Sequence, residues 1–247
     1  MIVAAALPGL PEIGRGDDLA ELLAGAARRL SDGDVLVVAH KVVSKAEGRT
    51  VELGDVEAGE RAQALGAEHG KDPRVVEVIL GESTEIVRSR PGVLICRTHH
   101  GFVCANAGVD ASNAGAPGRL VLLPIDPDAS ARALRARLRE ITGVAPAVVI
   151  TDSFGRAWRI GQADVAIGVA GLAVVDDWRG RSDAEQRELS ATIVAIADEA
   201  AGAADLVRRK DSREPAVLMR GLEDHVTDGD GPGAAALVRA RSEDLFL

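Results

Sequence analysis

Short apolar runs alternate along the chain with segments in which hydrophobic residues recur at helical spacing. Six of these runs are predicted to be strands: residues 35–38, 93–96, 120–123, 148–150, 165–169 and 216–219. Turn residues precede them, as in the segment 31–34, which holds a serine, two aspartates and a glycine. This alternation predicts a mixed α/β protein.

Capping signals predict where two of the helices begin and end. Asp126 precedes a proline at a first helical position, and the apolar spacing that follows stops at Gly143. Ser182 and Glu185 form a capping box, which predicts a long helix whose apolar face runs to residue 200. Both helices are expected to be scaffold.

The opening segment, residues 1–7, is apolar and is predicted to be the first strand. It lacks basic residues and reaches Pro8 and Gly9 too early for a signal peptide or a membrane span. A cytoplasmic protein that does not insert into a membrane is therefore expected.

Composition narrows the partners that the protein can have. Hydrophobic residues make up 47% of the 247 positions and charged residues 27%, which is typical of a packed globular protein. The net charge is −9 and aromatic residues are only 2%, so the chain offers neither a basic surface for phosphates nor a platform for base stacking. Nucleic acid is therefore not an expected partner.

The two cysteines, Cys96 and Cys104, flank a predicted hairpin turn at His99, His100 and Gly101. Antiparallel pairing would bring the thiols opposite each other, where a disulfide is conceivable, but two reduced buried thiols are expected in a cytosolic protein. A zinc site is disfavoured, because four ligands crowded on one short hairpin could not all face one ion.

Four polar segments follow apolar strands and are predicted to be loops that carry the chemistry: residues 9–13, 41–49, 106–113 and 151–162. A lysine in the second segment suits a phosphate, although a solvated loop is the usual place for a single lysine. Asp110 and Asp152 supply the hard oxygen donors that Mg²⁺ or Mn²⁺ prefers, although either could instead cap a helix.

No Walker A loop supports nucleotide binding, because the segment 66–72 has one residue too few between its glycines. Arg156 and Arg159 lie close to Asp152 in the sequence and add donors for anionic oxygens. From these residues alone, the expected function is metal-assisted chemistry on an anionic substrate.

The same segments resemble the coenzyme F420:L-glutamate ligase family, the gamma-glutamyl ligases of F420 biosynthesis. The resemblance spans nearly the whole chain and includes Gly9-Leu10-Pro11, Val43-Ser44-Lys45-Ala46-Glu47-Gly48-Arg49, Asp110-Ala111-Ser112-Asn113 and Phe154-Gly155-Arg156. It implies a single ligase domain over residues 1–247, built as one unit or as two closely packed lobes. It also implies a mixed or antiparallel sheet with flanking helices, in an interlocked homodimer. Some members add a nitroreductase-like domain, and this sequence is expected to be the ligase domain alone.

The resemblance assigns roles to particular residues. GTP is expected to lie against Gly9, Leu10, Pro11, Glu12, Lys45 and Asn113, with His40 at a variable position on the nucleotide side. Mg²⁺ or Mn²⁺, two ions per site, is expected at Asp110, Asp152 and Ser153, where most members have threonine in place of Ser153. Lys45, Asp110 and Asp152 are the expected catalytic residues, and K⁺ is a further candidate ion.

The implied reaction joins L-glutamate to the lactyl-phosphate side chain of an F420 precursor through an acyl phosphate, with release of GDP and phosphate. A closing element would protect that intermediate from water, and the glycine-rich segment 228–233 is a candidate for it or for a nucleotide contact. Two other functions stay open: an amide ligase that uses GTP on another carboxylate, and a non-catalytic protein that binds a nucleotide or coenzyme.

Overall fold

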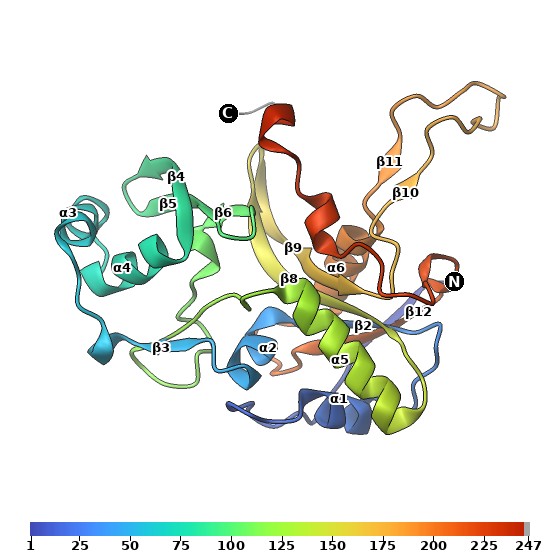
Figure 1. The fold of residues 1–247 in the computed structure, drawn as a ribbon, viewed down its shortest axis with the longest axis horizontal. Helices are drawn as coiled ribbons and strands as arrows, with labels where there is room; N and C mark the ends of the chain where they lie inside the picture. Colours follow the sequence, from blue (N-terminus) through green and yellow to red (C-terminus); the bar gives the residue numbers. More distant parts are fainter. Residues whose placement is uncertain (245–247) are drawn as a thin grey trace.

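A computed structural model describes residues 1–244, and its elements form a larger and a smaller lobe (Figure 1). The larger lobe is built on a five-stranded mixed sheet, in the order β1 (Val3–Ala6), β12 (Ala216–Arg220), β2 (Val35–Ala39), β8 (Ala147–Arg156) and β9 (Arg159–Ala170). Neighbouring strands are antiparallel except for β2 and β8, which are parallel.

The central strands are uninterrupted apolar runs because both faces of the sheet are covered. Residues 35–38 of β2 and 148–150 of β8 are fully buried. Alternate side chains point to opposite faces, so that Leu36 and Ile150 join one hydrophobic cluster while Val37 and Val149 join another. The predicted strands in this lobe are confirmed.

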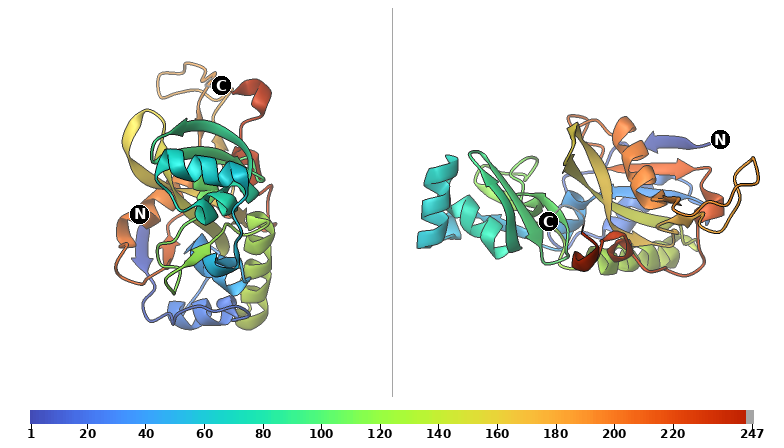
Figure 2. Two further views of the ribbon diagram at one scale, coloured as in Figure 1. Left: turned by 90° about the vertical axis from the view of Figure 1, so that its left-hand side faces the viewer. Right: turned by 90° about the horizontal axis from the view of Figure 1, so that it is seen from above.

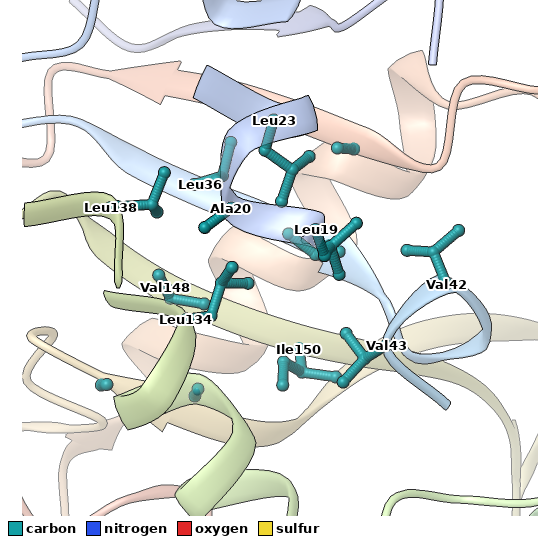
Figure 3. Close-up of a cluster of buried hydrophobic side chains, with 14 of the residues drawn as sticks. Leu19, Ala20, Leu23, Leu36, Val42, Val43, Leu134, Leu138, Val148 and Ile150 are labelled. Atoms are coloured by element: carbon teal, nitrogen blue, oxygen red, sulfur yellow. The ribbon is translucent and has the colours of Figure 1, made fainter. Parts of the chain in front are cut away.

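Helices α1 (Leu19–Ala27), α2 (His40–Ala46) and α5 (Pro127–Thr142) contribute side chains to the hydrophobic cluster on one face of this sheet, and α6 (Ile196–Val207) contributes to the cluster on the other (Figures 1 and 2). Figure 3 shows Leu23 and Leu134 packed with Leu36 and Val148 on the first face. Burial of these leucines is the main contribution to packing there.

Helix α5 has the predicted ends. The Asp126 carboxylate accepts a hydrogen bond from the amide of Ala129 at 2.8 Å, and Gly143 takes the left-handed conformation, with φ 79°, that ends many helices.

The smaller lobe has its own core, which includes Ile79, Leu94 and Leu120. Its elements are β3 (Thr50–Glu52), α3 (Glu60–His69), α4 (Pro73–Gly81), β4 (Ser83–Arg90), β5 (Val93–Thr98), β6 (Val103–Ala105) and β7 (Arg119–Val121). Strands β4, β5 and β6 form one antiparallel sheet, and β3 pairs with β7. The strands predicted at 93–96 and 120–123 are confirmed, although β7 ends two residues early.

Short elements complete the fold. They are the 3₁₀ turns at Leu53–Asp55, Asn106–Gly108, Glu223–His225, Ala234–Leu237 and Arg241–Glu243, and a two-stranded arm of β10 (Asp176–Asp177) and β11 (Ile193–Val194). Within residues 1–244, no helix is long and apolar enough to cross a bilayer. One chain is described, so the interlocked dimer stays a prediction.

Two of the predicted loops are regular elements instead. Residues 40–46 form helix α2. The helix has only seven residues, and its buried Val42 and Val43 are adjacent, so the sequence shows no clear helical period there. Residues 151–156 continue β8 and pair with β9, so that the segment 151–162 is a hairpin. Its polar residues are stable in a strand because Thr151 and Ser153 hydrogen-bond to Asp164 across the pair.

The capping box predicted at Ser182 and Glu185 does not start a helix. Residues 176–194 form the arm that projects from the larger lobe in Figure 1, and the helix begins only at Ile196. The Asp183 carboxylate accepts hydrogen bonds from the amides of Glu185 and Arg187, which closes a turn. This side-chain turn competes with helix formation.

The predicted hairpin between the cysteines is confirmed, because Cys96 of β5 lies opposite Cys104 of β6. Both thiols are free and buried. Burial raises the pKa of Cys96, and it raises the pKa of Cys104 to about 12.

We therefore expect Cys104 in the native protein to react very slowly with an aromatic disulfide reagent. The thiolate is the reactive form, and at pH 8 a pKa near 12 leaves roughly a thousandfold less thiolate than the ordinary value of 9.0. Absorbance of the released chromophore would measure the rate, with protein unfolded in guanidinium as the control. Equally rapid labelling of both cysteines in the folded and unfolded protein would contradict this expectation.

Candidate active site

Helix α2 begins directly at the end of β2 and carries three side chains of the candidate site. These are His40, Lys41 and Lys45. Lys41 and Lys45 are four residues apart, so that they lie on the same side of the helix. Each of the three side chains contacts a carboxylate from a different segment of the chain.

Lys45 contacts the loop that follows β1. Its ammonium lies 2.5 Å from Oε1 of Glu12, and the lysine side chain is largely buried whereas Glu12 is 71% exposed. The structure therefore brings together Lys45 and the loop 9–12, as expected for a nucleotide site. Most of the Glu12 side chain is in solvent, so this ion pair is exposed on the carboxylate side.

Lys41 contacts Asp110, which comes from the smaller lobe. Its ammonium is 2.6 Å from Oδ2 of Asp110 and 2.7 Å from Oγ of Ser112. Burial alone would raise the pKa of Asp110, but hydrogen bonds from Lys41 and Ser112 outweigh it and hold that pKa below its ordinary value. Asp110 is therefore ionised at neutral pH. Asn113, an expected nucleotide contact, lies in the same loop as Asp110.

His40 contacts Asp152. The imidazole is only 1% exposed, with Nε2 at 3.3 Å from Oδ1 of Asp152 and Nδ1 at 3.3 Å from Oγ of Ser44. The imidazole is therefore placed to orient the Asp152 carboxylate. The expected position of His40 on the nucleotide side stays a prediction.

Ser153 points away from Asp152. Its hydroxyl lies 2.6 Å from Oδ1 of Asp164 and 2.7 Å from the ammonium of Lys210, on the side of the sheet that α6 covers. Consecutive strand residues face opposite sides, so the structure brings Asp110 and Asp152 to the same end of α2 and places the Ser153 hydroxyl elsewhere. Of the three expected metal ligands, Asp110 and Asp152 thus lie at one end of α2, and the Ser153 side chain does not.

The donor set at α2 fits a divalent cation. Asp110 and Asp152 supply two carboxylates of the kind that Mg²⁺ and Mn²⁺ prefer, and Asp152 remains 16% exposed. A preformed cluster of three His, Cys, Asp or Glu side chains is absent from residues 1–244. The remaining ligands would therefore have to come from water, a hydroxyl or the substrate.

Sequence reasoning missed Lys41, Asp164, Arg208 and Lys210. If residues 40–46 are treated as a helix, Lys41 lies one turn before Lys45 and on the same side, and this spacing could have identified it. Asp164 and Lys210 contact Ser153, and Arg208 contacts Asp164, only through the β8–β9 pairing and the end of α6. Arg156 donates to the carbonyls of Ile160 and Gly161, and its expected contact with an anion stays a prediction.

Comparison with known protein families matches residues 9–221 to the family described as F420-0:Gamma-glutamyl ligase. The chain belongs to the F420-0:gamma-glutamyl ligase family. The matched range holds both lobes and every residue of the candidate site, so the resemblance inferred from the sequence is confirmed.

Relatives of the F420-0:gamma-glutamyl ligase family align with this chain along almost its whole length. The coenzyme F420:L-glutamate ligase of Methanopyrus kandleri is 52% identical over 94% of this chain and 92% of its own length. The coenzyme F420:L-glutamate ligases of Methanothermobacter thermautotrophicus and Archaeoglobus fulgidus are 44% and 43% identical, each over 96% of this chain, and are covered to 96% and 93%.

The Lys41–Asp110 contact predicts a pH-dependent loss of stability in Lys41→Met. The depressed pKa of Asp110 stabilises the folded protein at neutral pH, and this contribution disappears as pH falls below the ordinary value of 3.8 and through the folded pKa. The variant should lose about 0.5–1 kcal/mol of unfolding free energy at pH 7, since the pair is partly exposed.

Urea titrations of the two proteins between pH 7 and pH 3 would measure this difference, which should narrow as the solution becomes acidic. Lys71→Met, a loss of the same charge on the turn between α3 and α4, is the matched control. A difference that is independent of pH would show that the Lys41 side chain acts through packing alone.

Proposed function

We propose that this chain adds L-glutamate to the side-chain carboxylate of an F420 precursor, in a reaction that consumes GTP and requires a divalent cation. The relatives named coenzyme F420:L-glutamate ligase support the acceptor and the amino acid. The observation that carries the mechanism is the convergence of Lys45, Asp110 and Asp152 around one short helix.

Lys45 and the loop 9–12 are proposed to hold the GTP phosphates. The ammonium replaces its contact with Glu12 by a contact with phosphate oxygens, which carry more charge. Phosphoryl transfer depends mainly on positioning and on charge neutralisation, which a fixed ammonium on a helix provides. Asn113, in the loop that Lys41 anchors, is proposed to contact the nucleotide from the smaller lobe.

Asp110 and Asp152 are proposed to hold the divalent cation. When bound, the cation offsets negative charge on the transferring phosphoryl group. His40 and Lys41 orient the two carboxylates from the first turn of α2. Asp152 would offer Oδ2 to the ion, whereas Asp110, whose oxygens accept from Lys41 and Ser112, would exchange one of these hydrogen bonds for it.

The reaction proceeds in two steps. A carboxylate oxygen of the precursor attacks the γ-phosphorus of GTP, GDP leaves, and an acyl phosphate forms. The glutamate amine then attacks the acyl carbon and loses a proton, and inorganic phosphate leaves as the amide bond forms. Water must be excluded between the steps, because the acyl phosphate would hydrolyse.

The segment 228–233 is anchored to helix α5. Arg135 of α5 binds Oδ1 of Asp230 at 2.8 Å, and Asp128 accepts hydrogen bonds from the amides of Ala234 and Ala235. These contacts fix the segment and the residues after it to α5. Its expected role, as a closing element or as a nucleotide contact, stays a prediction.

Asp152→Asn tests the proposal most sharply. Asparagine keeps the shape and can still accept a hydrogen bond, but it lacks the charge that a hard dication needs, so ligation should fall at least about a hundredfold. The assay incubates the protein with F420 precursor, GTP, Mn²⁺ and glutamate, and detects added glutamyl units by mass spectrometry. Wild-type product together with near-normal Asp152→Asn activity would show that the metal site is misplaced.

Lys45→Ala separates nucleotide binding from folding. The variant should bind GTP at least about tenfold more weakly, because it loses a charge-assisted contact, whereas unfolding free energy should change by less than about 1 kcal/mol. Calorimetric titration with GTP and urea unfolding would measure the two effects. The exposed Lys210 gives a matched control as Lys210→Ala in the unfolding measurement. Unaltered GTP affinity would show that Lys45 does not contact the nucleotide and that its pair with Glu12 is purely structural.

A further inference from the structure

The Ser153 hydroxyl already has two polar partners in this structure. It donates to Oδ1 of Asp164 at 2.6 Å and accepts from the ammonium of Lys210 at 2.7 Å. These two contacts occupy its donor and one acceptor position. The place beside Ser153 that a divalent cation would need is therefore held by an ammonium group.

Asp164, the buried partner of Ser153, is also fully engaged. Its side chain is 1% exposed, and its second oxygen accepts from Oγ1 of Thr151 at 2.9 Å and from the guanidinium of Arg208. Arg208 further donates to Thr151 and to the carbonyl of Pro215. Such a satisfied buried network is costly to open, so Asp164 is not available as a free metal ligand.

The charges of this cluster balance without a metal ion. Lys210 lies 3.3 Å from Oδ1 of Asp205 and 3.8 Å from Oδ1 of Asp164. The two carboxylates are matched by the ammonium of Lys210 and the guanidinium of Arg208. A dication placed here would meet no uncompensated negative charge and would be repelled by the neighbouring ammonium.

On the α2 side of β8 the negative charges outnumber the positive ones. There Asp110 pairs with the ammonium of Lys41 and Glu12 with that of Lys45, whereas Asp152 contacts the imidazole of His40 and has no ammonium partner. One negative charge is left over, so a cation is attracted to this side and not to the other.

We propose that the Lys210 ammonium takes the place of a second divalent cation beside Ser153, so that each chain holds one divalent ion rather than two. This inference rests on the proposed function for the single ion at Asp110 and Asp152. Ser153 is then a positioning residue: its bond to Asp164 fixes β8 in the orientation that turns Asp152 toward α2.

The number of Mn²⁺ ions bound per chain tests this inference directly. Equilibrium dialysis of nucleotide-free protein, with free Mn²⁺ read by electron paramagnetic resonance, should give one ion for the wild type. Lys210→Glu replaces the ammonium by a carboxylate beside Ser153, Asp164 and Asp205, and it should bind two. Lys210→Met removes the charge without adding a ligand and should still bind one.

Arg209→Glu is the matched control, because it makes the same charge change one residue away, at an exposed side chain that pairs with Asp211. It should bind one ion. The Lys210 side chain is 69% exposed, so these variants are expected to fold, which circular dichroism would verify. Two ions in the wild type, or one ion in Lys210→Glu, would overturn the inference. No bound ion in the wild type would also overturn it and would show that the Asp110 and Asp152 site itself is wrong.

Discussion

The parallel pairing of β2 with β8 fixes the position of the candidate active site. In this register Ala39, the last residue of β2, lies opposite Thr151 of β8. The next residues along the chain are His40, the first residue of α2, and Asp152 of β8, and their side chains meet at 3.3 Å. Because both strands are buried on both faces, a shift of register would expose a large apolar area and is strongly disfavoured.

The second carboxylate depends on how the two lobes are joined. Asp110 belongs to the smaller lobe and is held there by an antiparallel bridge to Val121. Two ion pairs are among the contacts that tie this lobe to the segment that follows β2: Lys41 binds Asp110, and Arg49 binds Glu82 at 2.7 Å. A change in the angle between the lobes would thus separate Asp110 from Asp152, and this couples lobe placement to the proposed cation site.

The sequence was sufficient to predict the elements whose signals are local. The central strands are continuous apolar runs, and α5 has a capping aspartate and a closing glycine. Helix α2 was missed because seven residues with two buried valines give no clear period, and Lys41 was missed with it. The polar end of β8 was predicted as a loop because its stability comes from Asp164 and Arg208, which only tertiary structure brings near. The direction of the Ser153 side chain depends on the same part of β8, so the sequence did not predict it either.

In the proposed mechanism, α2 gathers Asp110 and Asp152 from two lobes to hold one divalent cation beside the GTP phosphates. A crystal structure with Mn²⁺ and a non-hydrolysable GTP analogue, with the ion located by its anomalous scattering, tests this claim directly. The account predicts a single Mn²⁺ ion per chain, in contact with both carboxylates and with a phosphate oxygen, while Lys45 contacts the phosphates. An ion bound away from either carboxylate, or a nucleotide bound at another surface, would contradict it.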